Sequence, residues 1–181
     1  MTFRKVRERQ VYAGHLFSLV EAEFEGPSGE TFMRSIVRHP GAVGVVPVHD
    51  DATVSLVRQY RAAAEADVLE IPAGVRDEEG EEPLATAERE LAEEVGLRAG
   101  RWRALTSYWV AIGFSDERFW CYLAEGLSEV DKAPASHEEE HMTVERVPLR
   151  DVPAMIARGE IQDAKTIIGL LMAREVLRVD E

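Results

Sequence analysis

Three glutamates at helical spacing are the side chains best suited to chemistry in this chain. Glu90, Glu93 and Glu94 stand at positions i, i+3 and i+4 within the run RELAEEVGL, residues 89–97. On an α-helix these positions share one face, about one turn apart. Like charges so placed repel one another, unless a hard divalent cation such as Mg²⁺ or Mn²⁺ binds their oxygens. The spacing therefore predicts a metal site formed by Glu90, Glu93 and Glu94.

An apolar stripe on the other side of the same segment would anchor the helix to a core. Leu84, Ala87, Leu91 and Val95 recur at helical spacing, and Gly96 supplies the stop signal expected just past a helix end. The alternative interpretation is a solvated acidic helix face, which is the usual one for glutamate-rich helices.

The residues around these glutamates resemble the signature of the Nudix hydrolases. The matching positions, in order, are Gly74, Glu81, Arg89-Glu90-Leu91, Glu93-Glu94 and Gly96. One spacing differs, because six residues separate Gly74 from Glu81 where the family has five, and Gly80 stands where a glutamate is expected. Loops absorb insertions at little cost. The resemblance therefore implies an intact metal helix and leaves the role of Glu81 open.

Further segments resemble the ADP-ribose pyrophosphatase branch of that family. They are HPGAV at 39–43, QYR at 59–61, LEIPAG at 69–74, GFSDE at 113–117 and GEI at 159–161. Related nucleoside-diphosphate-sugar enzymes share these segments, so they specify the substrate less closely than the helix specifies the family.

Composition restricts the class of partner. The chain has 181 residues and a net charge of −13, which argues against a nucleic-acid polymer but not against a small phosphorylated substrate. No apolar run is long enough to cross a bilayer, and the charged N-terminus lacks a signal-peptide core. The lone Cys121 excludes an internal disulfide framework. We expect a cytoplasmic protein with no membrane or nucleic-acid partner.

The order of the elements predicts an α+β fold. A helix follows Gly74, and two more helices are expected near 150–158 and 163–178. Strand-like residues are 3–24, 31–39, 42–48, 53–60, 68–71, 102–110, 118–123 and 142–147. This order favours an α/β/α sandwich with a mixed sheet, which the Nudix resemblance also implies. We expect a small N-terminal antiparallel β lobe at residues 1–40 and a Nudix hydrolase domain at residues 41–181.

The resemblance implies chemistry on a diphosphate bond. Cations held by the three glutamates would screen the negative oxygens and lower the pKa of a bound water. In this branch the backbone carbonyl at the position of Ala73 completes the metal shell. Arg89 is expected to hold neighbouring carboxylates in place.

A general base is sought in the loop sequence HEEEH, residues 137–141. Register with the corresponding loop of the branch favours Glu138. Glu140 is the second candidate, either as base or as a water-mediated ligand, and Glu94 is counted with them among the catalytic residues. A solvated acidic loop is the alternative. The two histidines lack a second ligand pair at a spacing suited to zinc.

Several side chains are candidates for holding the substrate. Arginine forks match phosphate oxygens, so the candidates for phosphate or terminal ribose are Arg38, Arg61 and Arg118. Glu70 and Glu117 are candidates for hydrogen bonds to hydroxyl or amino groups. The aromatic rings considered for stacking on adenine are Phe17, Tyr60 and Trp109, for which core packing is the default.

We therefore expect a hydrolase, dependent on Mg²⁺ or Mn²⁺, that splits ADP-ribose or a similar ADP-sugar into AMP and ribose 5-phosphate or another sugar phosphate. The alternatives are a pyrophosphatase for another nucleoside diphosphate sugar or nucleoside polyphosphate, and a non-catalytic protein that senses ADP-ribose. The branch usually forms homodimers in which N-terminal strands contribute to the partner's substrate pocket, and residues 1–40 suit that role.

Overall fold

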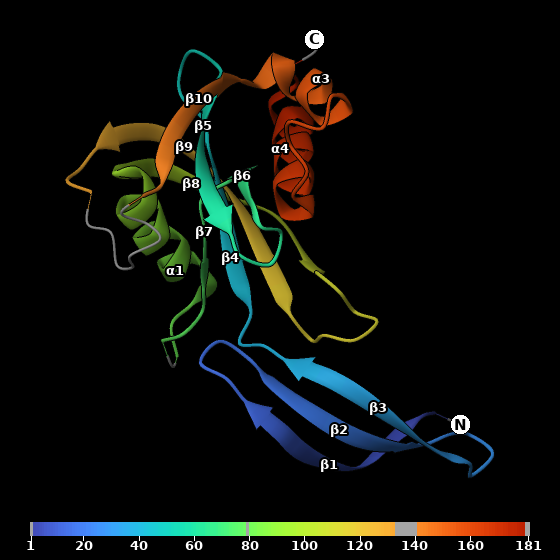
Figure 1. The fold of residues 1–181 in the computed structure, drawn as a ribbon. Helices are drawn as coiled ribbons and strands as arrows, with labels where there is room; N and C mark the ends of the chain where they lie inside the picture. The colour runs from blue at the N-terminus through green and yellow to red at the C-terminus, as the bar shows by residue number, and fades with distance from the viewer. Residues whose placement is uncertain (1, 79, 133–140, 180–181) are drawn as a thin grey trace. The chain divides into compact units, whose positions relative to one another are not determined.

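The computed structural model describes residues 2–78, 80–132 and 141–179 (Figure 1). Its strands are β1 (Arg4–Ala13), β2 (Ser18–Glu25), β3 (Thr31–Arg38), β4 (Ala42–Pro47), β5 (Thr53–Arg61), β6 (Ala66–Glu70), β7 (Ala73–Val75), β8 (Leu97–Trp109), β9 (Arg118–Glu129) and β10 (Thr143–Pro148). Its helical segments are α1 (Pro83–Glu90), the π-helical turn η1 (Leu91–Val95), the 3-10 turn η2 (Leu149–Asp151), α3 (Val152–Ala157) and α4 (Ala164–Leu177). The predicted α+β class is confirmed.

The chain divides into two compact units. Unit 1 comprises Met1–Gly41 and Tyr108–Phe119, and unit 2 comprises Ala42–Ser107 and Trp120–Glu181. Each unit is described separately below.

Unit 1 contains an antiparallel sheet in the order β1-β2-β3. The backbone N–H of Gly14 donates to the carbonyl of Phe17 at 2.9 Å, and this turn separates β1 from β2. The residues predicted as one extended run, 3–24, are therefore two strands. The expected turn between β2 and β3 is present, with Gly29 at a φ of 86°, in the left-handed region that favours glycine.

Unit 2 contains a three-stranded sheet, β10-β5-β6, and a four-stranded sheet, β7-β4-β9-β8. Successive residues of β4 point to opposite faces. Val43 packs with Ala87 and Leu91 of the segment α1–η1, whereas Val46 lies beside Gly169 of α4. Figure 1 shows α1 on one side of these strands and α4 on the other. The sheet thus fixes which face of α1 and η1 turns toward the core.

The described residues contain no helix that is both long and apolar enough to pass through a membrane. The longest, α4, has 14 residues.

Candidate active site

The acidic segment is held in one orientation by its ends and by its buried side. Pro83 occupies the first helical position, where its missing N–H costs nothing, and Gly96 ends the segment at a φ of 70°. Ala87 and Leu91 have no exposed surface. Because this side is buried against the sheet, the rotation of the helix is set, and with it the position of the glutamates.

Two of the three glutamates are themselves buried. Glu90 retains 7% of its surface exposure and Glu94 retains 4%, whereas the side chain of Glu93 retains 23%. A buried carboxylate is costly unless a cation or hydrogen-bond donors compensate its charge. A solvated acidic face therefore does not describe Glu90 or Glu94.

Arg89 is the cation among these acids. Its Nη1 donates to Glu90 Oε1 at 2.8 Å and to Glu93 Oε2 at 3.0 Å. Its Nη2 lies 3.6 Å from Asp77 Oδ1 and 3.6 Å from Glu81 Oε2. Burial lowers the pKa of Arg89, but the neighbouring carboxylates outweigh burial and raise it above its usual value. One positive charge thus faces four negative ones, which leaves a field that attracts further cations.

Strand β7 approaches the same carboxylates through its backbone. The N–H of Ala73 donates to Glu94 Oε2 at 2.9 Å. At the next residue, Gly74, an added Cβ would lie 1.9 Å from the carboxyl carbon of Glu90. Contact at that distance is impossible without displacement, so the close approach of β7 to Glu90 requires glycine at position 74.

The extra residue before Glu81 does not remove that glutamate from the cluster. Gly80 adopts a φ of 81°, and the hydroxyl of buried Thr86 donates to Glu81 Oε2 at 2.7 Å. Glu81 consequently lies within ion-pair distance of Arg89, despite the altered spacing.

The residues present suit a hard divalent cation in their chemistry, because carboxylate and carbonyl oxygens are the ligands that Mg²⁺ and Mn²⁺ prefer. Among the described residues, however, no three His, Cys, Asp or Glu side chains converge as a ligand cluster. Glu90 and Glu93 are turned to Arg89, and Glu94 is turned to the N–H of Ala73. Binding of a metal by this set would require these carboxylates to turn.

Arg61 and Glu70, two of the predicted substrate contacts, bind each other. Arg61 Nε and Nη2 donate to Glu70 Oε1 and Oε2 at 2.7 and 2.8 Å, and Glu70 is 2% exposed. The hydrogen bond to Glu70 raises the pKa of Arg61, and the nearby charges of Glu94 and Asp163 add to this effect. The structure therefore brings this pair close to one of the helix glutamates.

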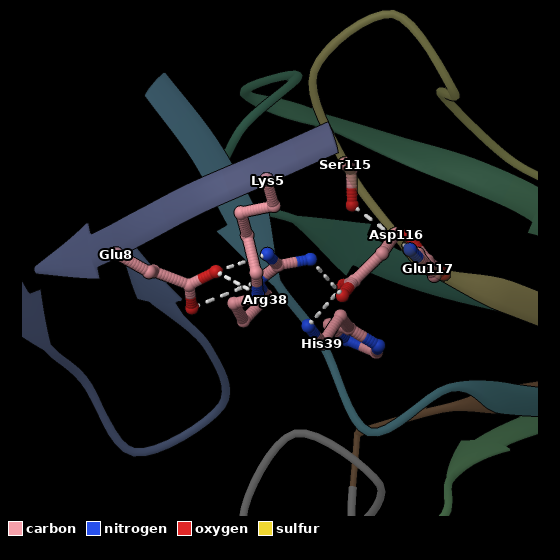
Figure 2. A network of polar contacts seen from close by, with 7 residues as sticks. All are labelled: Lys5, Glu8, Arg38, His39, Ser115, Asp116 and Glu117. Atoms are coloured by element: carbon pink, nitrogen blue, oxygen red, sulfur yellow. Dashed lines mark hydrogen bonds and ion pairs between the residues drawn. The ribbon is translucent and has the colours of Figure 1, made fainter. Parts of the chain in front are cut away.

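Arg38, in unit 1, is engaged by two carboxylates (Figure 2). Its Nη2 donates to Glu8 Oε2 at 2.5 Å, and its Nη1 donates to Asp116 Oδ2 at 2.8 Å. Asp116 also accepts from the backbone N–H of His39 at 2.9 Å. The guanidinium of Arg38 thus ties β1 and β3 to residues 115–117 within this unit.

The other predicted contacts of unit 1 lie apart from this network. Phe17 is 41% exposed, with its ring 6.0 Å from that of Tyr12. The guanidinium of Arg118 lies 5.1 Å from the ring centroid of Trp109, which is 45% exposed. The backbone N–H of Glu117 donates to Ser115 Oγ.

Tyr60 of unit 2 is 57% exposed, so its ring does not pack in the core as assumed by default. Glu138 and Glu140, the two candidates for the base, and His137 lie outside the described residues.

A NUDIX domain model matches residues 38–168. The chain belongs to the Nudix family. The matched range contains the acidic helix, β7 and the Arg61–Glu70 pair.

Curated Nudix relatives match nearly the whole chain. The ADP-ribose pyrophosphatase of Mycobacterium tuberculosis is 38% identical over 96% of this chain and 84% of its own length. The ADP-ribose pyrophosphatase of Bacillus subtilis is 36% identical over 98% of this chain and 97% of its own. The methanol dehydrogenase activator of Bacillus methanolicus is also 36% identical, over 97% and 95%.

A solved structure shares the fold. The crystal structure of an ADP compounds hydrolase superposes with a TM-score of 0.86 over 99% of this chain and 96% of that one, at 23% identity. The predicted Nudix-type α/β/α sandwich with a mixed sheet is confirmed by this likeness.

Two residues of the Nudix site were not given a role by the sequence. Thr86 binds Glu81, and Gly74 makes room for Glu90. Gly74 carried a signal, since it opens the family pattern. Thr86 carried none, because threonine inside a helix is usually unremarkable.

Proposed function

We propose that the chain hydrolyses the diphosphate bond of ADP-ribose, or of a similar ADP-sugar, to AMP and ribose 5-phosphate or the corresponding sugar phosphate, with Mg²⁺ or Mn²⁺ as cofactor. The names of the M. tuberculosis and B. subtilis relatives support this substrate class, because each matches nearly the full chain. The alternative within the family is another nucleoside diphosphate sugar or a nucleoside polyphosphate. A non-catalytic ADP-ribose sensor would be expected to have a degraded metal helix, and here the helix is complete.

One observation carries the proposal: two glutamates are buried on a helix that offers them only one arginine. In the proposed roles Glu90, Glu93, Glu94 and the carbonyl of Ala73 hold the metal, and Arg89 keeps the carboxylates in register. When bound, the cation supplies charge screening of the diphosphate and lowers the pKa of a bound water. Glu138 takes the proton of the attacking water, and Glu140 is the second candidate for that role.

The proposed substrate contacts are divided between the two units. In unit 2, Arg61 and Glu70 lie near Glu94, and bidentate arginine suits phosphate oxygens. In unit 1, the proposed contacts are Phe17, Arg38, Glu117 and Arg118. Because Arg38 already binds Glu8 and Asp116, its role includes holding residues 115–117 in place.

The proposal includes a homodimer in which residues 1–40 contact the partner copy. Large apolar side chains of this segment are exposed, including Phe3 at 66%, Tyr12 at 54% and Met33 at 51%. Exposed apolar clusters of this kind favour protein contacts. Light scattering of the purified protein tests the dimer, and cell fractionation tests the cytoplasmic location that the proposal also includes.

The function is tested by incubating purified protein with ADP-ribose and Mg²⁺ and resolving the products by ion-exchange chromatography. AMP and ribose 5-phosphate should appear in equal amounts and should not form when EDTA is present. Parallel reactions with GDP-sugars and nucleoside polyphosphates rank the substrate classes. Binding of ADP-ribose without any cleavage would instead favour the sensor.

The base is tested by Glu138→Gln and Glu140→Gln. The variant that removes the base should lose turnover by orders of magnitude while keeping its melting temperature. Wild-type rates in both variants would reject the assignment of the base to this loop.

A further inference from the structure

Gln59 of β5 carries a buried donor for which the described part of the chain supplies no acceptor. The residue is 6% exposed, and its Nε2 atom is buried without a hydrogen-bond partner. Buried donors in native proteins are nearly always paired, because an unpaired one loses its hydrogen bonds to water without compensation. An unpaired donor on a well-ordered strand indicates a partner that comes from outside.

The side chain of Gln59 points to the face of β5 that packs against η1. Side chains alternate along a strand, so Ser55, Gln59 and Arg61 share one face. Ser55 lines a hollow together with Val95 and Gly96, at the end of η1. At the other end of this face, the pKa of Arg61 is raised by its hydrogen bond to Glu70 and also by the charge of Glu94. Gln59 lies between these two positions.

The immediate neighbours of Gln59 on this face cannot accept its proton. Val57 precedes it and Val68 lies opposite it on β6, and both side chains are apolar. Arg61, which follows it, has donors only. The hydroxyl of Ser55 is already bonded to His49 Nε2 at 2.8 Å. A ligand oxygen would satisfy the amide where these side chains do not.

We propose that Gln59 is a substrate-binding residue, whose side-chain amide donates a hydrogen bond to an oxygen of the bound nucleoside diphosphate sugar beside Arg61. The inference rests on the proposed function. Phosphate and hydroxyl oxygens of such a substrate are both acceptors, and Nε2 is a neutral donor that suits either. Because the amide is unpaired beforehand, its hydrogen bond is gained only on binding.

Gln59→Met tests this, since methionine has similar length and no polar donor. The KM for ADP-ribose should rise about 3- to 10-fold, as expected for loss of one neutral hydrogen bond, with kcat nearly unchanged. The melting temperature of the ligand-free variant should equal or exceed that of the wild type, because no intramolecular bond is lost. An unchanged KM overturns the proposal, and so does a loss confined to kcat.

Gln162→Met is the matched control. The Nε2 of Gln162 donates to the carbonyl of Gly159 at 2.8 Å, so this amide already has its partner within the chain. Its replacement should leave KM unchanged and lower the melting temperature slightly. If Gln59→Met instead lowers the ligand-free melting temperature as much as the control does, Gln59 has a partner within the protein and the proposal fails.

A measurement on the wild type removes any dependence on the variant's folding. The side-chain amide signals of Gln59 are followed by NMR in protein labelled with nitrogen-15, assigned by comparison with Gln59→Met. A non-hydrolysable ADP-ribose analogue should shift them, and separate additions of AMP and ribose 5-phosphate identify which half carries the acceptor. An equal shift with Mg²⁺ alone would overturn the substrate contact.

The two hypotheses fail in different ways. If the wild type does not cleave ADP-ribose or a related diphosphate, the proposed function fails before the variant is considered. If the wild type cleaves ADP-ribose and Gln59→Met has the same KM, only the inference on Gln59 fails.

Discussion

The backbone of Gly74 lies so close to the carboxyl group of Glu90 that a Cβ at position 74 would stand 1.9 Å from its carboxyl carbon. Strand β7 and helix α1 thus meet at a point where one side has no side chain. The position of Glu90 depends on this absence as much as on its hydrogen bond to Arg89.

Gly74→Ala should therefore displace the Glu90 carboxylate. We expect the rate of ADP-ribose hydrolysis to fall about 10- to 100-fold, which is typical when support for a metal ligand is lost. Overpacking should cost about 1–3 kcal/mol of stability, measured by urea unfolding. Gly100→Ala is the control, because its new Cβ would meet only the carbonyl of Gly126, at 3.4 Å. Equal rates for the two variants would contradict this account of Gly74.

Glu94→Gln should abolish most turnover while preserving the fold. The amide oxygen can still accept from the N–H of Ala73, but the charge that attracts the metal is lost. Steady-state kinetics should show a loss of orders of magnitude and a higher Mg²⁺ requirement. Glu88→Gln, at an exposed position of the same helix, should behave as the wild type. A fully active Glu94→Gln enzyme would remove Glu94 from the metal site.

Arg89→Met should make stability depend strongly on Mg²⁺. Without the guanidinium, the carboxylates of Glu90 and Glu93 repel one another with no compensating cation. Thermal unfolding should show a marked loss of stability in EDTA and a smaller loss at saturating Mg²⁺, because only the folded state assembles the site. A loss that is independent of Mg²⁺ would mean that metal and arginine do not share these ligands.

Acid should weaken the network around Arg38. Its hydrogen bond to Glu8, followed by that from Lys5, lowers the pKa of Glu8 from 4.5 to about 2. Because the folded-state pKa is lowered, this contribution to stability is complete above pH 4.5 and is lost as the pH falls toward 2.

Glu8→Gln should consequently be less stable than the wild type at neutral pH, by at most about 1 kcal/mol for a partly exposed pair. The difference should shrink as the pH falls toward the lowered pKa. Urea unfolding at a series of pH values measures this difference. A constant gap across the series would show that Glu8 acts by something other than its charge.

Much of the fold was predictable because each signal was local. The periodic apolar residues of α1, the stop at Gly96 and the turn before β3 each depend on a few adjacent residues. The break at Gly14–Phe17 was missed because alternation continues on both sides of it. The π-helical turn η1 was not predicted either, since its sequence also suits an α-helix.

The site was predictable in its acidic helix and less so in its surroundings. Spacing alone brought Glu90, Glu93 and Glu94 together, but it gave no indication that Glu90 and Glu94 are buried. The pairing of Arg38 with Glu8 joins residues 30 positions apart, which one sequence does not reveal. For the same reason the unpaired amide of Gln59 became visible only when its neighbours were placed.

Calorimetric titration of the purified protein with Mg²⁺, in the presence of a non-hydrolysable ADP-ribose analogue, tests the central claim most directly. The account predicts saturable uptake of the cation by the wild type and its loss in Glu94→Gln. Absence of uptake by the wild type, with and without the analogue, would contradict the assignment of the acidic helix to metal binding.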